Sequence, residues 1–129
     1  MLRNTVITRT LTQDDFNAFA ELSLDDNPIH VDPEFAATTR FGGTVAHGLF
    51  LCTILRGLAD KLVPGGRQLA QSVIFPAPTY VGRPIAFTAE VMRVNEGKAE
   101  LLMRATDTTT GTETCFIEAT FAQPLENNL

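Results

Sequence analysis

The sequence predicts an α+β fold in which a curved antiparallel sheet of about five strands wraps around one long central helix. Two observations carry this prediction. Three segments in the second half alternate apolar and polar residues with the period of a β-strand, and residues 44–63 carry an apolar stripe at helical spacing. A chain of 129 residues is long enough to bury one core, so we expect a single domain over residues 1–129.

The strand pattern defines a sheet with one buried face. The positions expected to point inward are Ile85, Phe87, Ala89 and Val91, then Ala99, Leu101, Met103 and Ala105, and finally Cys115, Ile117, Ala119 and Phe121. Asn95-Glu96-Gly97 joins the first two strands with a glycine where a positive φ is needed, and residues 107–111 form a looser connection. These three strands are predicted to form an antiparallel meander, and strands near residues 6–10 and 68–75 complete the sheet.

The helices are marked by caps and by apolar spacing. Thr12 and Asp15 resemble a capping box that opens a helix to about Leu22, and Asp32-Pro33 resembles the start of a short helix through residue 37. Residues 23–32 are polar and contain Asn27-Pro28, which predicts a loop. The central helix, residues 44–63, is apolar around most of its circumference and should be wrapped on several sides.

Composition limits the classes of partner. The net charge of −5 and the lack of clustered Lys and Arg argue against nucleic acid. No apolar run resembles a signal peptide or a membrane span, so we expect a cytosolic protein without a membrane partner. Cys52 and Cys115 have no close cysteine in the sequence and are predicted to be reduced core residues, and residues 126–129 are expected to form a loose tail.

Asp25 and His30 are the first candidates for a catalytic pair. They lie five positions apart on either side of Asn27-Pro28, and a loop bent by this dipeptide can direct both side chains onto one water molecule. Imidazole exchanges a proton near neutral pH, so the pair is suited to moving protons. The alternative is that Asp25 and Asn27 only satisfy turn backbone and that His30 is half-buried without a chemical role.

Gly48 is the second candidate, at the start of the predicted central helix. Free backbone N–H groups at a helix start favour developing negative charge, and a glycine lets a ligand approach the backbone closely. A thioester carbonyl placed there would find an oxyanion hole. The alternative is that Gly48 only allows close packing of helix and sheet.

The pattern D-x-N-P-I-H-x-D-P-x-F-A, followed by V-A-H-G-L, resembles the signature of the MaoC-like (R)-specific enoyl-CoA hydratases. A later element, Phe75-x-x-Pro78-x-x-x-Gly82, is also similar to that family. The resemblance implies a hotdog fold, at least a homodimer, catalytic roles for Asp25 and His30 with loop support from Asn27, and an oxyanion hole at Gly48. It implies reversible syn hydration of trans-2-enoyl thioesters to (R)-3-hydroxyacyl thioesters. No metal or redox cofactor is implied, and coenzyme A or acyl-carrier protein enters only as the acyl carrier.

Some positions depart from the family pattern or extend it. Leu24 stands where the family has a glycine before the catalytic acid, and Arg83-Pro84 replaces an acid after Gly82. Arg56 lies eight residues after Gly48, so Arg56 and Cys52 are candidates to line the acyl pocket, where a guanidinium would suit an acyl chain ending in an acceptor such as carboxylate. The alternative is that Arg56 reaches solvent or pairs across a dimer.

Three rival functions stay open at this stage. A hotdog acyl-CoA thioesterase would bind the same class of thioester but hydrolyse it. A non-catalytic acyl-thioester-binding module would bind without turnover. A metal site built from Asp25, His30 and Asp32 has suitable ligand types, but all three lie on one loop without a second ligand segment.

Overall fold

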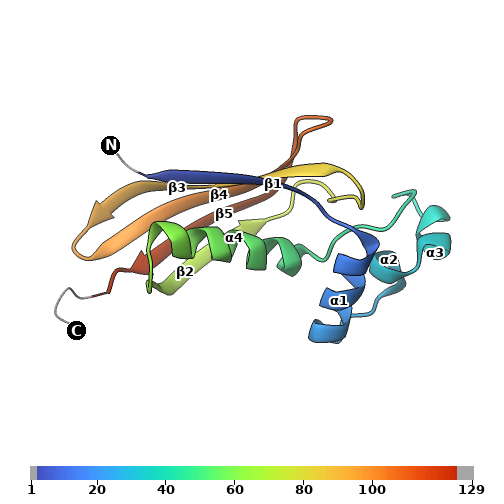
Figure 1. The fold of residues 1–129 in the computed structure, drawn as a ribbon, viewed down its shortest axis with the longest axis horizontal. Helices are drawn as coiled ribbons and strands as arrows, with labels where there is room; N and C mark the ends of the chain where they lie inside the picture. The colour runs from blue at the N-terminus through green and yellow to red at the C-terminus, as the bar shows by residue number, and fades with distance from the viewer. Residues whose placement is uncertain (1–2, 125–129) are drawn as a thin grey trace.

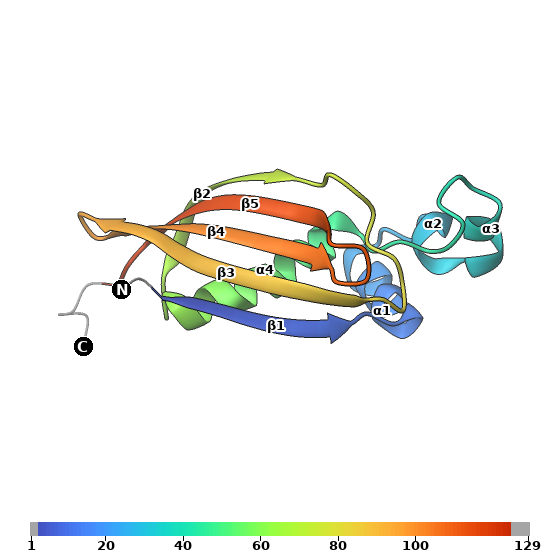
Figure 2. The same cartoon turned by 90° about the horizontal axis from the view of Figure 1, so that it is seen from above.

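The computed structural model describes residues 3–124, so the predicted tail at residues 126–129 lies outside the described residues. One five-stranded antiparallel sheet has the order β1-β3-β4-β5-β2, and helix α4 lies against one face of it (Figures 1 and 2). The three shorter helices gather at the end where α4 begins (Figure 1). The elements are β1 (Asn4–Thr10), α1 (Gln13–Ser23), α2 (Pro28–Val31), α3 (Pro33–Ala37), α4 (Gly48–Leu62), β2 (Arg67–Ile74), β3 (Pro84–Asn95), β4 (Lys98–Asp107) and β5 (Thr112–Ala122).

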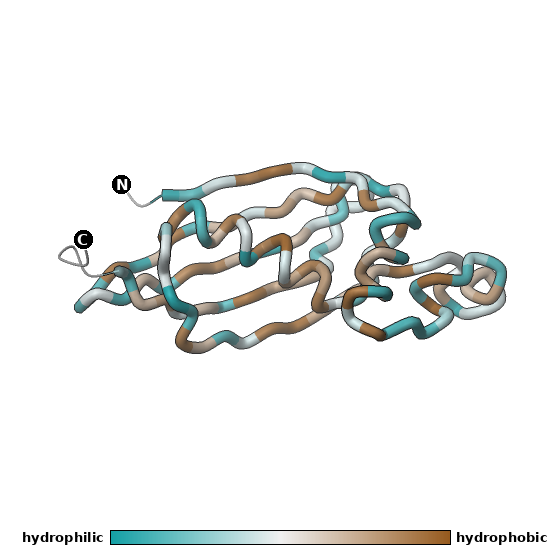
Figure 3. The backbone as a smooth tube through the Cα atoms, turned by 60° about the horizontal axis from the view of Figure 1, so that its bottom comes forward, coloured by the Kyte–Doolittle hydropathy of each residue, from teal (hydrophilic) through white to brown (hydrophobic). Residues whose placement is uncertain are grey.

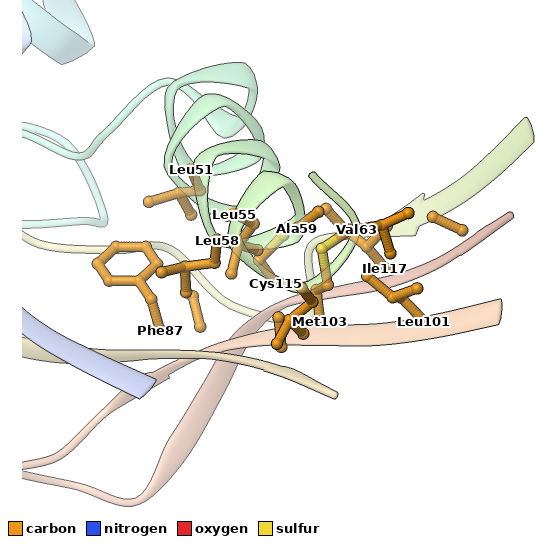
Figure 4. Packing of buried hydrophobic residues seen from close by; sticks show 14 of the residues in the cluster. Leu51, Leu55, Leu58, Ala59, Val63, Phe87, Leu101, Met103, Cys115 and Ile117 are labelled. Carbon is orange, nitrogen blue, oxygen red and sulfur yellow. The ribbon is translucent and has the colours of Figure 1, made fainter. Parts of the chain in front are cut away.

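The predicted antiparallel meander of β3, β4 and β5 is confirmed, and all of its predicted inward positions are buried. Leucines of α4 pack onto this face, over side chains such as Phe87 and Met103 (Figure 4). Hydrophobic segments accordingly lie along α4 and the strands (Figure 3). Glu96 and Gly97 both have positive φ, 52° and 75°, and make the tight turn between β3 and β4 that suits the right-handed twist of the strands.

The central helix is shorter at its start than the sequence predicts. Residues 44–47 are not helical, and Val45 instead forms an isolated antiparallel bridge with Tyr80. The Ala46 N–H donates to the Thr79 carbonyl, and the Val81 N–H donates to the Thr44 carbonyl. The apolar spacing predicted too long a helix because Val45 is buried in this bridge just as it would be in a helix.

The polar segment at residues 23–32 was predicted to be a loop, and here the structure adds the short helix α2. Asn27 has the non-helical φ of −52° and ψ of 131° that a following proline imposes, as predicted. Pro28 then occupies the first helical position, where its missing N–H has no intrahelical partner to lose. The other caps are confirmed: Thr12 and Asp15 make the capping box of α1, and Asp32 caps α3.

Helix α4 is covered by the sheet on one side only within the described residues. Its buried residues are Leu51, Leu55, Leu58, Ala59 and Leu62. Leu49 is 67% exposed, and Phe50 and Ile54 are only partly buried. The expectation that this helix is wrapped on several sides is therefore not met by residues 3–124 alone. None of the described helices is both long enough and apolar enough to cross a bilayer.

Arg83, which departs from the family pattern, anchors the entrance to β3. Its Nη1 donates to Asp107 Oδ2 at 3.0 Å, and its guanidinium lies 4.6 Å from the centre of the Tyr80 ring. Asp107 is 2% exposed. Burial alone would raise the pKa of Asp107, but hydrogen bonds from Thr109 and Arg83 outweigh it and hold the pKa of this carboxyl below its usual range.

We expect Asp107→Asn to lower the free energy of unfolding by about 2 kcal/mol at neutral pH, because it removes charge-assisted hydrogen bonds from a buried site. The carboxylate contributes this stability above its unfolded-state pKa of roughly 3.9, and the contribution is lost as the pH falls through the lower folded-state pKa. Urea unfolding of wild type and variant at pH 7 and pH 3 measures the loss of stability and its dependence on pH. Glu100→Gln, which breaks the exposed ion pair with Arg93, is the matched control and should cost less than about 1 kcal/mol.

Candidate active site

Asp25 lies on the short connection between α1 and α2, and the backbone around it is held by local hydrogen bonds. The Asp25 N–H donates to Ser23 Oγ, and Asp25 Oδ1 accepts from the Asn27 N–H. Asn27 Oδ1 in turn accepts from the Ile29 N–H at 3.1 Å, which caps α2. Asn27 thus supports the connection from its N-cap position, and one oxygen of Asp25, Oδ2, faces His30.

His30 lies on α2, and its tautomer follows from its surroundings. Nδ1 is 2.8 Å from the carbonyl oxygen of Val45. A carbonyl oxygen can only accept, so Nδ1 carries the proton, and in the neutral ring Nε2 keeps its lone pair. Nε2 lies 4.0 Å from Asp25 Oδ2, with the His30 side chain 15% exposed and the Asp25 side chain 56% exposed. His30 therefore presents a basic nitrogen beside a carboxylate at an open surface.

The separation of these two acceptors suits a bridging water molecule. At 4.0 Å, Nε2 and Oδ2 are too far apart for a direct hydrogen bond. A water at roughly 2.8 Å from each would donate one O–H to the nitrogen and the other to the carboxylate, with its oxygen lone pairs directed elsewhere. The arrangement can hold a nucleophilic water between two proton acceptors.

The segment before α4 and the start of α1 hold this pair in place. The Val45 N–H donates to the Ile29 carbonyl, and Gln13 Nε2 donates to the His30 carbonyl at 2.8 Å. Gln13 Oε1 also accepts from the buried Thr44 hydroxyl at 2.7 Å. Sequence reasoning did not identify Gln13, because a glutamine in the first turn of a helix carries no signal for a partner 31 positions away.

His47 joins the pair, although the sequence analysis gave it no role of its own. Its ring is 3% exposed and stacks on the His30 ring with centroids 3.8 Å apart and planes at 21°. Its Nε2 donates to the Asp25 backbone carbonyl at 2.8 Å. The sequence pointed to His47 only through its place beside Gly48 in the V-A-H-G-L pattern.

Asp25, His30 and His47 each offer a metal-ligand atom, and these atoms lie within 4.8 Å of one another. The ring geometry does not suit a shared ion. Imidazole binds a metal through a lone pair in the ring plane at roughly 2.0–2.1 Å, and the in-plane lone pairs of nearly parallel stacked rings do not converge on one point. Asp32, the third ligand considered from the sequence, uses its Oδ1 to accept from Glu34 and Phe35 N–H groups instead.

Gly48 is the first residue of α4, with His47 as the N-cap. Within the described residues, no protein group accepts from its N–H, as expected for the first residues of a helix. A Cβ on Gly48 would lie 2.6 Å from the Phe75 ring, so a side chain here would displace that ring. Both residues line a pocket of about 320 Å³ with mostly apolar walls, completed by Ala46, Leu49, Leu51, Ala77, Pro78, Thr79 and Thr114.

Arg56 and Cys52 do not line this pocket. Arg56 donates to the Gly66 carbonyl at 3.2 Å and lies over the Phe121 ring, so their assignment to the acyl pocket stays a prediction. The Cys52 thiol interacts with Cys115, which the sequence analysis placed apart from it. A hydrogen bond between the thiols lowers the pKa of Cys52, and this bond together with burial raises the pKa of Cys115.

Comparison with known proteins identifies the family of this chain. A family model described as "MaoC like domain" matches residues 2–113, so the chain belongs to this family. It is 42% identical over 83 residues to an (R)-specific enoyl-CoA hydratase of Aeromonas caviae, a match that covers 63% of this chain and only 62% of that protein. It is 31% identical over 120 residues to an (R)-specific enoyl-CoA hydratase of Rhodospirillum rubrum, covering 92% of this chain and 83% of that one.

The fold is confirmed as the hotdog fold by comparison with a solved structure. An (R)-hydratase from A. caviae, described as involved in PHA biosynthesis, superposes with a TM-score of 0.89 at 32% identity, covering 95% of this chain and 96% of that one.

Leu24 shows why the family pattern has a glycine before the acid. It is the C-cap of α1 and has left-handed backbone angles, φ 66° and ψ 11°. This conformation costs a residue with a Cβ roughly 1–2 kcal/mol, and the Leu24 side chain is 85% exposed, so packing recovers little of the cost. The backbone is therefore strained at the turn before Asp25.

We therefore expect Leu24→Gly to raise the free energy of unfolding by about 1 kcal/mol, after the entropy that a glycine loses on folding is subtracted. Chemical denaturation measures the change. Leu24→Ala is the control, because alanine keeps the Cβ and the left-handed strain while it removes the same exposed side chain. Equal stabilisation by alanine and glycine would show that the exposed leucine, not the backbone, is the source.

Proposed function

We propose that this protein hydrates trans-2-enoyl thioesters reversibly to (R)-3-hydroxyacyl thioesters. The observation that carries the proposal is the 4.0 Å separation of Asp25 Oδ2 from a His30 Nε2 whose lone pair is kept free by the Nδ1 bond to Val45. Its relatives in Aeromonas caviae and Rhodospirillum rubrum are named (R)-specific enoyl-CoA hydratases. The cytosolic location expected from the sequence belongs to this proposal as well.

The chemistry follows from the bridging water. One member of the Asp25/His30 pair removes a proton while the water oxygen bonds to the β-carbon of the enoyl group. The electron pair of the C=C bond moves towards the thioester, and the proton taken from water is delivered to the α-carbon. Both new bonds form on the face where the pair lies, which gives syn addition. Water is added and no electron is gained or lost, so this reaction does not call for a redox cofactor.

Gly48 supplies the electrostatic part of the mechanism. Its N–H at the start of α4, which has no acceptor among residues 3–124, would donate to the thioester oxygen as that oxygen becomes enolate-like. The apolar pocket beside it, bounded by Phe75 and Leu51, would take the uncharged part of the substrate next to the thioester. Coenzyme A or acyl-carrier protein would carry the acyl group and remain part of the substrate.

The rival functions differ in their products. A thioesterase would release free thiol, which a thiol-reactive dye detects, and a binding module would bind the thioester without consuming it. Two proton acceptors spaced to hold one water favour an enzyme over a module that only binds, because binding alone has no use for a basic nitrogen kept free beside a carboxylate. The (R)-specific enoyl-CoA hydratases among the relatives favour hydration over thioester hydrolysis.

Asp25→Asn and His30→Ala should each lower kcat for crotonyl-CoA hydration by about 10²–10⁴-fold, the range typical of a lost general acid or base, while the protein stays folded. Loss of absorbance of the conjugated enoyl thioester measures turnover, and chiral analysis of the product tests for the (R) isomer. Asp26→Asn is the matched control, because Asp26 is exposed on the same connection. Near-normal turnover in either site variant, or an (S) product, would contradict the proposal.

We also propose a homodimer built on the outer edge of β2. Within the described part of the chain this strand pairs only with β5, so its other edge is unpaired. Leu69, Ile74 and Phe75 are exposed on and just after it, at 43%, 57% and 46%. An edge strand with exposed apolar side chains favours pairing with another chain. A second copy would also cover apolar surface that the sheet leaves open on α4, such as Leu49.

Light scattering should give a mass about twice the 14.1 kDa of one chain. Leu69→Lys should shift the mass towards the monomer, because it places a charge on the proposed interface. Val6→Lys on the opposite edge strand β1, where Val6 is 59% exposed, is the control and should leave the dimer intact. A monomeric wild type, or dissociation of the dimer by the Val6 change alone, would contradict the proposed interface.

A further inference from the structure

His47 contacts both members of the proposed catalytic pair through different parts of one ring. Its Nε2 donates to the Asp25 backbone carbonyl at 2.8 Å, and its face stacks on the His30 ring at 3.8 Å between centroids. The Phe19 ring packs against it at 4.9 Å in an edge arrangement and restricts it further. Asp25 and His30 are thereby held relative to each other by a third side chain.

The hydrogen-bonding state of His47 argues against a role in packing alone. Because Nε2 donates, Nδ1 carries the lone pair in the neutral ring, and it is buried with no partner among the described residues. An unpaired buried polar atom costs roughly 1–3 kcal/mol, a cost that an apolar side chain of similar shape would avoid. The hydrogen bond from the other nitrogen, Nε2, to the main chain of Asp25 explains why a histidine stands at this position.

We propose that His47 is a positioning residue for the enoyl hydration described above, an inference that rests on that proposed function. It fixes the main chain at Asp25 and the ring plane of His30, and so maintains the separation that holds one water between Oδ2 and Nε2. It is also the N-cap of α4, next to Gly48, so it ties the pair to the N–H that receives the thioester oxygen. His47 itself touches neither water nor substrate in this proposal.

Two amide substitutions separate this role from space filling. The amide nitrogen of glutamine can take the place of imidazole Nε2, whereas that of asparagine takes the place of Nδ1. His47→Gln should therefore keep the hydrogen bond to the Asp25 carbonyl, and His47→Asn should lose it although it is the same kind of side chain. His47→Ala removes both the bond and the stacked ring.

The kinetic test measures kcat and KM for crotonyl-CoA in wild type and in the three variants. A misplacement of about 1 Å can cost about 10²-fold in rate, so kcat should fall about 10–100-fold in the Asn and Ala variants with KM within about threefold of wild type. The Gln variant should have a higher kcat than the Asn variant, although below wild type because glutamine lacks the ring that stacks on His30. Equal rates in the Gln and Asn variants, or wild-type kcat in the Ala variant, would overturn the proposal.

A second readout needs no turnover. The chain has two histidines, so the imidazole region of a ¹⁵N nuclear magnetic resonance spectrum holds two ring systems. The structure assigns them opposite tautomers, Nδ1–H for His30 and Nε2–H for His47. An Nδ1–H tautomer at His47 would overturn the proposal even if the Asn and Ala variants failed to fold. A wild type without hydration activity but with opposite tautomers would instead refute the proposed function, and with it the role of His47 in that reaction.

Discussion

The hydrogen bond from His30 Nδ1 to the Val45 carbonyl is the constraint on which the rest of the site depends. It puts the proton on the nitrogen that faces the protein and leaves the lone pair on the nitrogen that faces Asp25. In a helix that began at residue 44, the Val45 carbonyl would point along the helix axis to the N–H four residues later instead of towards His30. The late start of α4, at Gly48, therefore lets this carbonyl set the tautomer of His30.

The same late start also positions the N–H that we propose as the oxyanion-hole donor. The first N–H groups of a helix have no intrahelical acceptor, and here they begin at Gly48, one residue after a histidine that contacts Asp25 and His30. The isolated bridge between Val45 and Tyr80 is what prevents the helix from extending backwards. One short stretch of extended chain thus separates the proposed oxyanion-hole N–H from the proposed catalytic pair and keeps both at the same end of the fold.

The parts of the fold that follow local rules could be predicted from the sequence. Every position that alternation predicted to point inward in β3, β4 and β5 is buried, and the caps at Thr12 and Asp32 marked true helix starts. These features depend on neighbours within a few residues, or on a period that a strand repeats. The early helix start failed because apolar spacing does not distinguish a buried bridge residue from a buried helix residue.

The candidate site was predicted only in part, because its main contacts join residues that are distant in sequence. Five positions separate Asp25 from His30, and a bent loop made their approach foreseeable. The bonds from His30 to Val45, from His47 to Asp25 and from Thr44 to Gln13 span 15, 22 and 31 positions, and no local pattern encodes them. The contact between Cys52 and Cys115 was missed for the same reason.

Leu24 shows that contacts distant in the sequence can override the backbone angles that a residue prefers. A residue with a Cβ disfavours the left-handed angles that end α1, yet the turn is formed because both sides of it are fixed. Before it, Phe16 and Ala20 bury one face of α1, and after it, the Asp25 carbonyl is bound by His47. Strain of about 1–2 kcal/mol persists where surrounding contacts over-determine the backbone. The strained residue lies directly beside the proposed catalytic acid, so the contacts that hold Asp25 in position also maintain the strain.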